Sequence, residues 1–232
     1  MKTIGIGLLC LLFNFADNMV LHQTEASGKA PLTYLALGDS YTVGESVTAS
    51  ASFPFQLQQA LRERGVPVKT PKVIARTGWT TGELLAALQQ ADPKPGYDLV
   101  TLLIGVNNQY RGYPPDLYER EFTELLTKAI AYAGGKKDRV FVLSIPDWSV
   151  TPFAAASGRD IKKTGEEINA YNHMSAVICE RTGVSYTDIT PVSRKAAANK
   201  DLTAADGLHP SGKMYGFWTA ALLPAVRAAL NF

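Results

Sequence analysis

A short apolar run ends in a polar turn at Leu35-Ala36-Leu37-Gly38-Asp39-Ser40-Tyr41-Thr42. An apolar run of this kind is typical of a buried strand, and the residues that follow it turn the chain toward a helix. Ligands of open α/β sheets bind at the carboxyl ends of the strands. A serine there becomes a nucleophile when a neighbouring base, most often histidine, accepts its proton. Ser40 is therefore a candidate nucleophile, and its alternative role is to cap the following helix.

From residue 32 onward, strand-like apolar runs alternate with helical patterns. Four of the five expected strands are short and continuously apolar, which is typical of parallel strands covered on both faces. This order predicts a three-layer α/β/α sandwich around a five-stranded parallel sheet, built by a single domain over residues 27–232. Pro224 is expected to kink or split the last helix. The expected strands are 33–37, 68–75, 99–104, 140–145 and 184–187, and the expected helices are 55–64, 81–90, 115–133, 160–182 and 211–230.

The composition is that of an ordinary globular protein, with 46% hydrophobic and 19% charged residues. The formal net charge is +2, and no block of basic residues occurs. Nothing in the sequence therefore indicates a nucleic-acid partner.

Residues 1–26 are expected to be an export signal and a short N-terminal segment. Lys2 precedes a largely apolar run over 4–15 that is too short to span a bilayer. We therefore expect an exported protein, periplasmic or secreted, without stable membrane insertion once the signal is removed; the cleavage site is left open. Cys10 allows a lipoprotein alternative, although the bulky Leu9 before it fits a lipidation motif poorly. Cys179 would remain as a lone thiol, expected to be buried in a helix.

Only three histidines are available as a base for Ser40. His22 lies in the segment before the first strand, and His173 lies in the middle of an expected helix. His209 stands just before the last helix, three residues after Asp206. This spacing on a loop allows the carboxylate to hydrogen-bond Nδ1 of the ring and leaves Nε2 free to face a hydroxyl. Capping of the helix by the two polar residues is the alternative.

Two further strand ends carry groups suited to an oxyanion hole. Gly78 follows the second expected strand, and its small size allows its N–H to approach a developing oxyanion closely. Asn107 follows the third strand and could offer a side-chain N–H. Taken singly, a tight turn at Gly78 and a side-chain turn at Asn107 are the alternatives.

Four blocks of the chain together resemble the SGNH, or GDSL-type, hydrolases, a family named for a serine, a glycine, an asparagine and a histidine. The resemblance covers nearly the whole chain after the expected signal, with the blocks in the family's order. Tyr41 replaces the leucine of the family's name. Asn108 stands where many members have aspartate, so any bracing of the loop by that carboxylate must be supplied differently. The matching blocks are Gly38-Asp39-Ser40-Tyr41, Gly78, Gly105-Val106-Asn107 and Asp206-Gly207-Leu208-His209-Pro210.

The resemblance implies a carboxylic ester hydrolase with a flavodoxin-like fold and no metal or cofactor. Ser40 would attack the acyl carbonyl, His209 would accept its proton and Asp206 would orient the imidazole ring. The backbone N–H groups of Ser40 and Gly78 and the side chain of Asn107 would bind the oxyanion. Water would then release the acyl group, with His209 again as the base.

The substrate is expected to be a small-molecule, carbohydrate or lipid ester. Asp39, Asn108, Tyr110 and Trp148 are the expected substrate contacts, although packing beneath a loop is the alternative role for Trp148. The sequence has no long apolar lid segment, which favours a short acyl chain or a sugar acetate. A lysophospholipase or thioesterase acting on longer acyl chains is the first alternative. The sequence leaves the physiological ester and the oligomeric state open.

Proteins of three other classes are also compatible with parts of the pattern. A non-catalytic glycan-binding module on the same fold would have no need of the intact triad. A metal-dependent phosphoesterase would have to use Asp39, Asn107 and His209, which do not form a carboxylate-rich ligand set. A flavodoxin-like electron carrier shares the fold, but the first loop here is a tight turn and not a hydroxyl-rich phosphate cradle.

Overall fold

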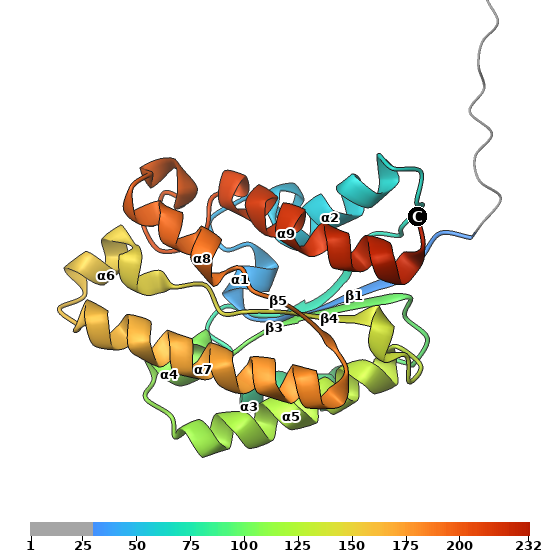
Figure 1. The fold of residues 1–232 in the computed structure, drawn as a ribbon, viewed down its shortest axis with the longest axis horizontal. Coiled ribbons are helices and arrows are strands. Elements are labelled where there is room, and N and C mark those ends of the chain that lie inside the picture. Colours follow the sequence, from blue (N-terminus) through green and yellow to red (C-terminus); the bar gives the residue numbers. More distant parts are fainter. Residues whose placement is uncertain (1–29) are drawn as a thin grey trace, which may run out of the picture.

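The computed structural model describes residues 30–232, so the expected signal, with Cys10 and His22, lies outside the described residues. Five parallel strands form one sheet in the order β2-β1-β3-β4-β5 (Figure 1). This is the flavodoxin-like strand order, and it confirms the predicted five-stranded parallel sheet. The strands are β1 (Tyr34–Gly38), β2 (Lys72–Ala75), β3 (Leu99–Leu103), β4 (Val140–Leu143) and β5 (Ser185–Thr187).

Helices cover both faces of the sheet and complete the predicted sandwich (Figure 1). On one face α2 packs against α9, and on the other α5 packs against both α3 and α7. The α-helices are α1 (Ser40–Val43), α2 (Phe53–Arg62), α3 (Thr81–Ala91), α4 (Val106–Tyr110), α5 (Pro115–Tyr132), α6 (Pro152–Ala156), α7 (Ile161–Thr182), α8 (Thr190–Ser193) and α9 (Gly212–Leu230). The 3-10 turns are η1 (Ala49–Ala51), η2 (Lys137–Arg139), η3 (Trp148–Val150), η4 (Arg194–Ala197) and η5 (Lys200–Leu202).

The three inner strands are apolar because they are covered on both faces. Every residue of β1, β3 and β4 is buried, whereas the edge strands β2 and β5 keep partly exposed side chains. The register aligns Gly38 of β1 with Ala75 of β2 and Leu103 of β3. The loops after these three strands therefore leave the sheet at the same edge, where ligands of such folds bind.

Two local expectations are corrected by the structure. Residues 146–158, for which the sequence predicts neither a strand nor a helix, contain η3 and α6. The last helix is not split at Pro224, which lies inside the continuous α9. Buried side chains precede and follow this proline, with Trp218 and Leu222 on one side and Val226 on the other. Tertiary packing therefore holds the helix together across the position where proline removes one backbone hydrogen bond.

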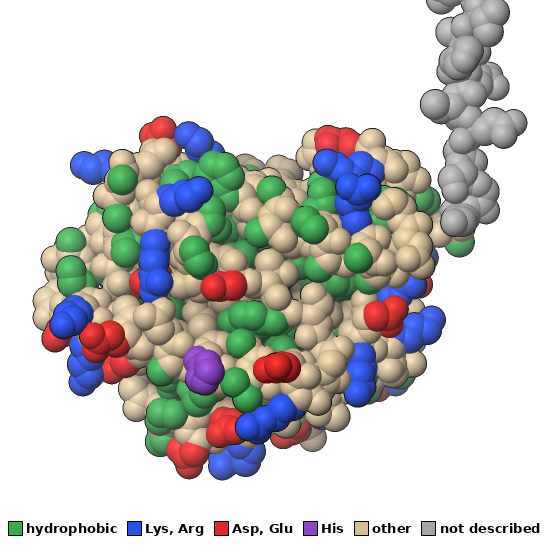
Figure 2. Space-filling view, viewed as in Figure 1, with side chains coloured by type: hydrophobic (Ala, Val, Ile, Leu, Met, Phe, Trp, Pro, Cys, Tyr) green, Lys and Arg blue, Asp and Glu red, His purple; other side chains and the backbone are tan. Residues whose placement is uncertain are grey.

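The surface of the described residues carries charges of both signs. On the face seen in Figure 2, basic and acidic side chains are interspersed, and the basic ones do not gather into one patch. Within residues 30–232, no helix is long and apolar enough to cross a membrane. Cys179 is fully buried in α7, as expected for a structural thiol.

Candidate active site

One cavity collects the polar residues that were predicted to form the active site. Its volume is about 240 Å³, and it is lined by residues that follow the ends of β1, β2 and β3. Ser40 comes from the first position of α1, Gly78 from the loop after β2 and Asn107 from α4. His209 reaches the cavity from the loop before α9. The structure thus brings together residues from four separate parts of the chain.

Asp206 contacts the ring of His209 and carries a stabilised negative charge. Its Oδ2 lies 2.6 Å from Nδ1 of His209, and its Oδ1 accepts hydrogen bonds from the backbone N–H groups of Leu208 and His209 at 2.9 and 3.0 Å. Partial burial opposes ionisation, but hydrogen bonds from Ser46, His209 and Leu208 outweigh it and hold the pKa of the Asp206 carboxyl well below its usual value. A carboxylate at Nδ1 selects the tautomer that leaves Nε2 free to accept a proton.

Ser40 lines the cavity with only 5% of its surface exposed. The alternative role considered for it, capping of the helix, belongs instead to Asp39, whose Oδ1 accepts a hydrogen bond from Tyr41 N–H at 3.0 Å. Within residues 30–232 no hydrogen bond joins Ser40 Oγ to His209. Such bonds are often long in substrate-free enzymes, and both side chains face the same cavity. The Ser40 hydroxyl is therefore available for chemistry and not committed to the helix.

The segments after β2 and β3 hold Gly78 and Asn107 in place beside the cavity. Gly78 has a φ of +86°, and a Cβ there would meet only Arg111 Nη2, at 3.8 Å. Backbone conformation, and not lack of space, therefore requires glycine at this position. Asn107 Nδ2 donates a hydrogen bond to Trp79 O at 2.9 Å, which fixes the amide and leaves its second N–H for another acceptor. Arg111 Nη2 donates to Gly78 O at 2.6 Å and braces the same loop.

Two of the four predicted substrate contacts are contradicted by the structure. Asp39 and Asn108 are both fully buried, so neither side chain can contact a substrate in the cavity. Asn108 instead braces the loop, because its Oδ1 accepts from Thr81 N–H at 3.0 Å and its Nδ2 donates to Thr81 Oγ1 at 2.6 Å. The Asn108 amide thus braces this loop without a carboxylate. Tyr110 and Trp148, the other two, do line the cavity.

Asp39 is expected to make the folding stability depend on pH. Burial raises the pKa of Asp39 to about 7, above the value of about 4 expected in the unfolded chain. Its contribution to folding stability is therefore fully present below about pH 4 and is lost as the pH rises through about 7. Because asparagine does not ionise, Asp39→Asn is expected to gain folding stability relative to wild type as the pH rises through this window. The gain is about a few kcal/mol, so the Tm of the variant rises by several degrees relative to that of wild type. Thermal unfolding followed by circular dichroism measures this difference, and a difference independent of pH would contradict the assignment.

An aromatic wall closes one side of the cavity. The Trp148 ring lies 5.5 Å from that of Tyr110 and 6.1 Å from that of Phe153, measured between ring centroids. Trp148 Nε1 donates to Gln109 Oε1 at 2.9 Å, which orients the indole. Arg159 stacks over Tyr110, with the guanidinium carbon 4.1 Å from the ring centroid. This contact was not predicted, because no local signal relates Arg159 to a residue in α4.

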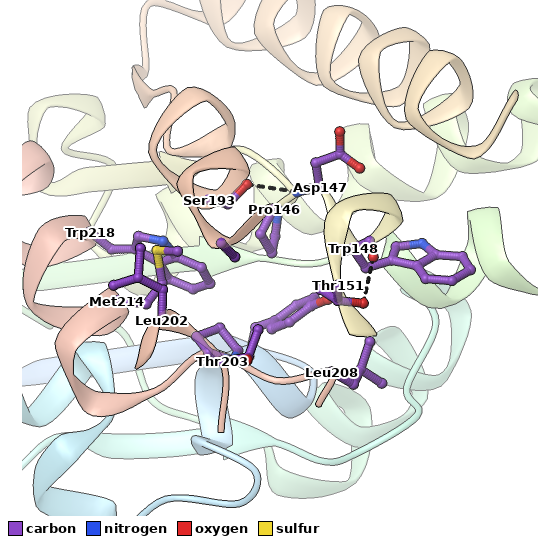
Figure 3. A pocket seen from close by; sticks show the side chains of 13 residues that line it. Pro146, Asp147, Trp148, Thr151, Ser193, Leu202, Thr203, Leu208, Met214 and Trp218 are labelled. Atoms are coloured by element: carbon purple, nitrogen blue, oxygen red, sulfur yellow. Dashed lines mark hydrogen bonds between the residues drawn. The ribbon is translucent and has the colours of Figure 1, made fainter. Parts of the chain in front are cut away.

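A second, much smaller cavity adjoins the first behind Trp148. Figure 3 shows it between Pro146, Met214 and Trp218. Tyr41, Trp148 and Leu208 line both cavities. Hydrogen bonds from Asp147 N–H to Ser193 and from Thr151 to the Trp148 carbonyl hold its walls. Its volume of about 20 Å³ is about that needed for one water molecule. It is therefore too small to hold an acyl chain.

His173 does not belong to the active-site cavity. It is exposed on α7, where it lines a separate surface groove with Asn169, Tyr186 and Arg194. Within residues 30–232, no three His, Cys, Asp or Glu side chains gather into a set that could hold a metal ion.

Comparison with known proteins identifies the family. Residues 36–217 match the GDSL-like lipase/acylhydrolase family. Because this match spans most of the 232 residues, the chain belongs to that family, and the resemblance predicted from its four sequence blocks is confirmed.

Several known esterases are similar to this chain. An arylesterase of Vibrio mimicus is 32% identical over 102 residues, which are 44% of this chain and 50% of the relative. The match thus spans about half the length of that curated protein. Among solved structures, the psychrotrophic esterase EstA from Pseudoalteromonas sp. is similar over 87% of this chain and 100% of its own, with 20% identity and a TM-score of 0.61. The acetylxylan esterase Axe2 from Geobacillus stearothermophilus is similar over 84% and 94%, with 19% identity and a TM-score of 0.62. At these identities the two structures show the shared fold.

Proposed function

We propose that the protein is a serine esterase that hydrolyses carboxylic esters through an acyl-Ser40 intermediate. The observation that carries the proposal is the meeting of Ser40 and the Asp206–His209 pair in one cavity, at the strand ends that also present Gly78 and Asn107. Family membership supports the same reaction class. A nucleophile, an oriented base and convergent N–H donors are together what acyl transfer requires.

The geometry suggests how each group acts. His209 Nε2 accepts the proton of Ser40 as its Oγ attacks the acyl carbonyl, and the imidazolium then delivers that proton to the departing alcohol. Asp206 stabilises the imidazolium through Nδ1. The developing oxyanion is bound by the free N–H groups beside the cavity, those of Ser40, Gly78 and Asn107. Water then attacks the acyl-enzyme, with His209 again as base.

We propose a short acyl group or a sugar acetate as the preferred substrate. The cavity volume of about 240 Å³ lies below the range of about 300–1,000 Å³ that is usual for ligand pockets, so a long acyl chain would extend beyond it. The wall formed by Tyr110, Trp148 and Phe153 offers flat apolar faces to a sugar or an aryl group. An arylesterase and an acetylxylan esterase are among the similar proteins, and their names also favour a small ester substrate.

A chain-length series tests this proposal. With p-nitrophenyl esters from acetate to palmitate, kcat/KM is expected to be highest for acetate or butyrate and about a hundredfold lower for palmitate, because the cavity cannot admit the long chain while its carbonyl stays aligned on Ser40. An acetylated xylo-oligosaccharide tests the sugar acetate directly. A profile that rises with chain length would favour the lysophospholipase or thioesterase alternative. Absence of hydrolysis, together with no covalent labelling by a p-nitrophenyl phosphonate, would favour the non-catalytic module.

We also propose that the protein is exported, on the basis of residues 1–26. The charged start and short apolar run support a cleaved signal. The mass of the protein recovered from the periplasm or the medium tests this, because a cleaved protein lacks the apolar run, whereas recovery of the uncleaved chain from the cytoplasm would contradict the proposal.

A further inference from the structure

The segment after the nucleophile helix contains a residue in an uncommon backbone conformation. Ser46 has a φ of +64°, in the left-handed region that residues other than glycine seldom adopt. Strained positions of this kind persist only where surrounding contacts determine them, and they cluster at functional sites. Ser46 is exposed to solvent, so burial of its side chain does not explain the conformation. It lies in a tight turn closed by a hydrogen bond of 3.2 Å from Val47 N–H to Gly44 O, and this turn directs its hydroxyl group to a specific partner.

The Ser46 hydroxyl binds the acid of the proposed triad. Its Oγ donates a hydrogen bond of 2.6 Å to Oδ2 of Asp206, a residue 160 positions away in the chain. This is the same oxygen that lies 2.6 Å from Nδ1 of His209. Since Oδ1 is held by two backbone N–H groups, the Ser46 bond completes the set that fixes the carboxylate plane. Hydrogen bonds to an ionised carboxylate are short and strong compared with neutral ones.

The neighbours of Ser46 connect it to the rest of the site. The backbone N–H groups of Gly44 and Glu45 both donate to the carbonyl of Ser40, at 3.0 and 3.1 Å. The Glu45 carboxylate accepts a hydrogen bond from the hydroxyl of Thr77, the residue before Gly78. Glu45 and Ser46 therefore join helix α1 to two other loops. Glu45 contacts the loop that carries Gly78, and Ser46 contacts the loop that carries Asp206.

We infer that Ser46 is a positioning residue for the esterase reaction, which holds the Asp206 carboxylate in the plane that the His209 ring requires. The inference rests on the proposed roles of Ser40, Asp206 and His209 and adds a fourth side chain to them. Without the hydroxyl, the partly exposed carboxylate can rotate about its side-chain bond or bind water at Oδ2. The imidazole then loses part of its orientation, which slows proton transfer while leaving the substrate cavity unchanged.

Ser46→Ala and Ser46→Gly test the role of the hydroxyl. Both variants are expected to lower kcat for p-nitrophenyl acetate by about tenfold and to leave KM within about twofold of wild type. Glycine adopts the left-handed conformation without strain, so Ser46→Gly separates loss of the hydroxyl from any loss of fold. Ser50→Ala is the matched control, because Ser50 is an exposed serine nearby whose hydroxyl has only Thr48 as a hydrogen-bond partner among the described residues, and it is expected to keep the wild-type kcat. Wild-type kcat in Ser46→Gly would overturn the inference.

A double-mutant cycle identifies the partner. In an Asp206→Ala background the Ser46→Ala substitution is expected to change kcat by less than about twofold, because the hydrogen bond is already absent. A full tenfold effect in that background would overturn the inference and point to a general role in the loop. The cycle also distinguishes failure of the proposed triad from failure of the role inferred for Ser46. If Asp206→Ala itself keeps the wild-type kcat, the triad fails and the inference with it, whereas a slow Asp206→Ala beside an unaffected Ser46→Ala overturns the inference alone.

Discussion

Replacement of Ser40 by alanine is expected to lower kcat for p-nitrophenyl acetate by about ten-thousand-fold or more, with no loss of folded protein. The variant lacks the atom to which the acyl group becomes attached, so only the N–H donors and the cavity continue to favour the reaction. A residual rate above that in water is expected from these groups. Initial rates measured at high enzyme concentration determine the loss.

The fold of this variant should be preserved, for a reason specific to the turn. Asp39, and not Ser40, caps helix α1 through its bond to Tyr41 N–H, so alanine at position 40 removes no cap. We therefore expect the Tm of Ser40→Ala to lie within about 2 °C of wild type. Labelling by a p-nitrophenyl phosphonate, read by mass spectrometry, should modify the wild type and not the variant. Rapid hydrolysis by a folded Ser40→Ala variant would remove the proposed nucleophile.

The sheet was predictable because its strands are buried on both faces. The runs that became β1, β3 and β4 are almost wholly apolar, and such runs have few alternatives in an alternating α/β chain. The short helices α4, α6 and α8 were not predicted, because four or five residues are too few to show a helical period. The local effect of Pro224 predicts a kinked or split helix; the split does not occur, because buried side chains on both sides of the proline continue α9.

The site was predictable to the extent that chemistry restricted the choice of residues. With three histidines in the sequence, the Asp206–His209 spacing stood out, and the structure places the two side chains 2.6 Å apart. Asp39 and Asn108 were misjudged because adjacency in sequence does not decide which way a side chain points. Each lies next to a residue that faces the cavity, and each is turned into the interior.

Ser46 could not have been found in this way. It follows Ser40 by six residues, but its partner Asp206 lies in the loop before α9. No spacing rule relates a serine in one loop to a carboxylate in another, and its positive φ is set by the folded structure. Contacts between loops that converge at the edge of a sheet are the part of an active site that the sequence does not display.

Replacement of Asp206 by asparagine is expected to lower kcat by about ten-thousand-fold at neutral pH, although the side-chain volume is nearly unchanged. Asparagine can keep its Oδ1 as the acceptor for the N–H groups of Leu208 and His209, so the loop retains its shape. Its amide N–H₂ then faces Nδ1 of His209, where the carboxylate oxygen stood. A donor at this position favours the tautomer that carries its proton on Nε2, and such a ring cannot accept the proton of Ser40.

The pH dependence of the wild type should agree with this role for Asp206. Its hydrogen bonds hold the pKa of the Asp206 carboxyl well below the usual value, so the carboxylate stays ionised throughout the range in which esterase rates are measured. Any acidic limb of kcat/KM therefore reports another group, and it should not be attributed to protonation of Asp206.

Comparison of Asp206→Asn with Asp206→Ala separates the effect of the His209 tautomer from the effect of the lost negative charge. Alanine, which leaves Nδ1 free to bind water, is expected to be no slower than asparagine. A loss of less than about tenfold in both variants would show that His209 works without an oriented partner and would contradict the triad.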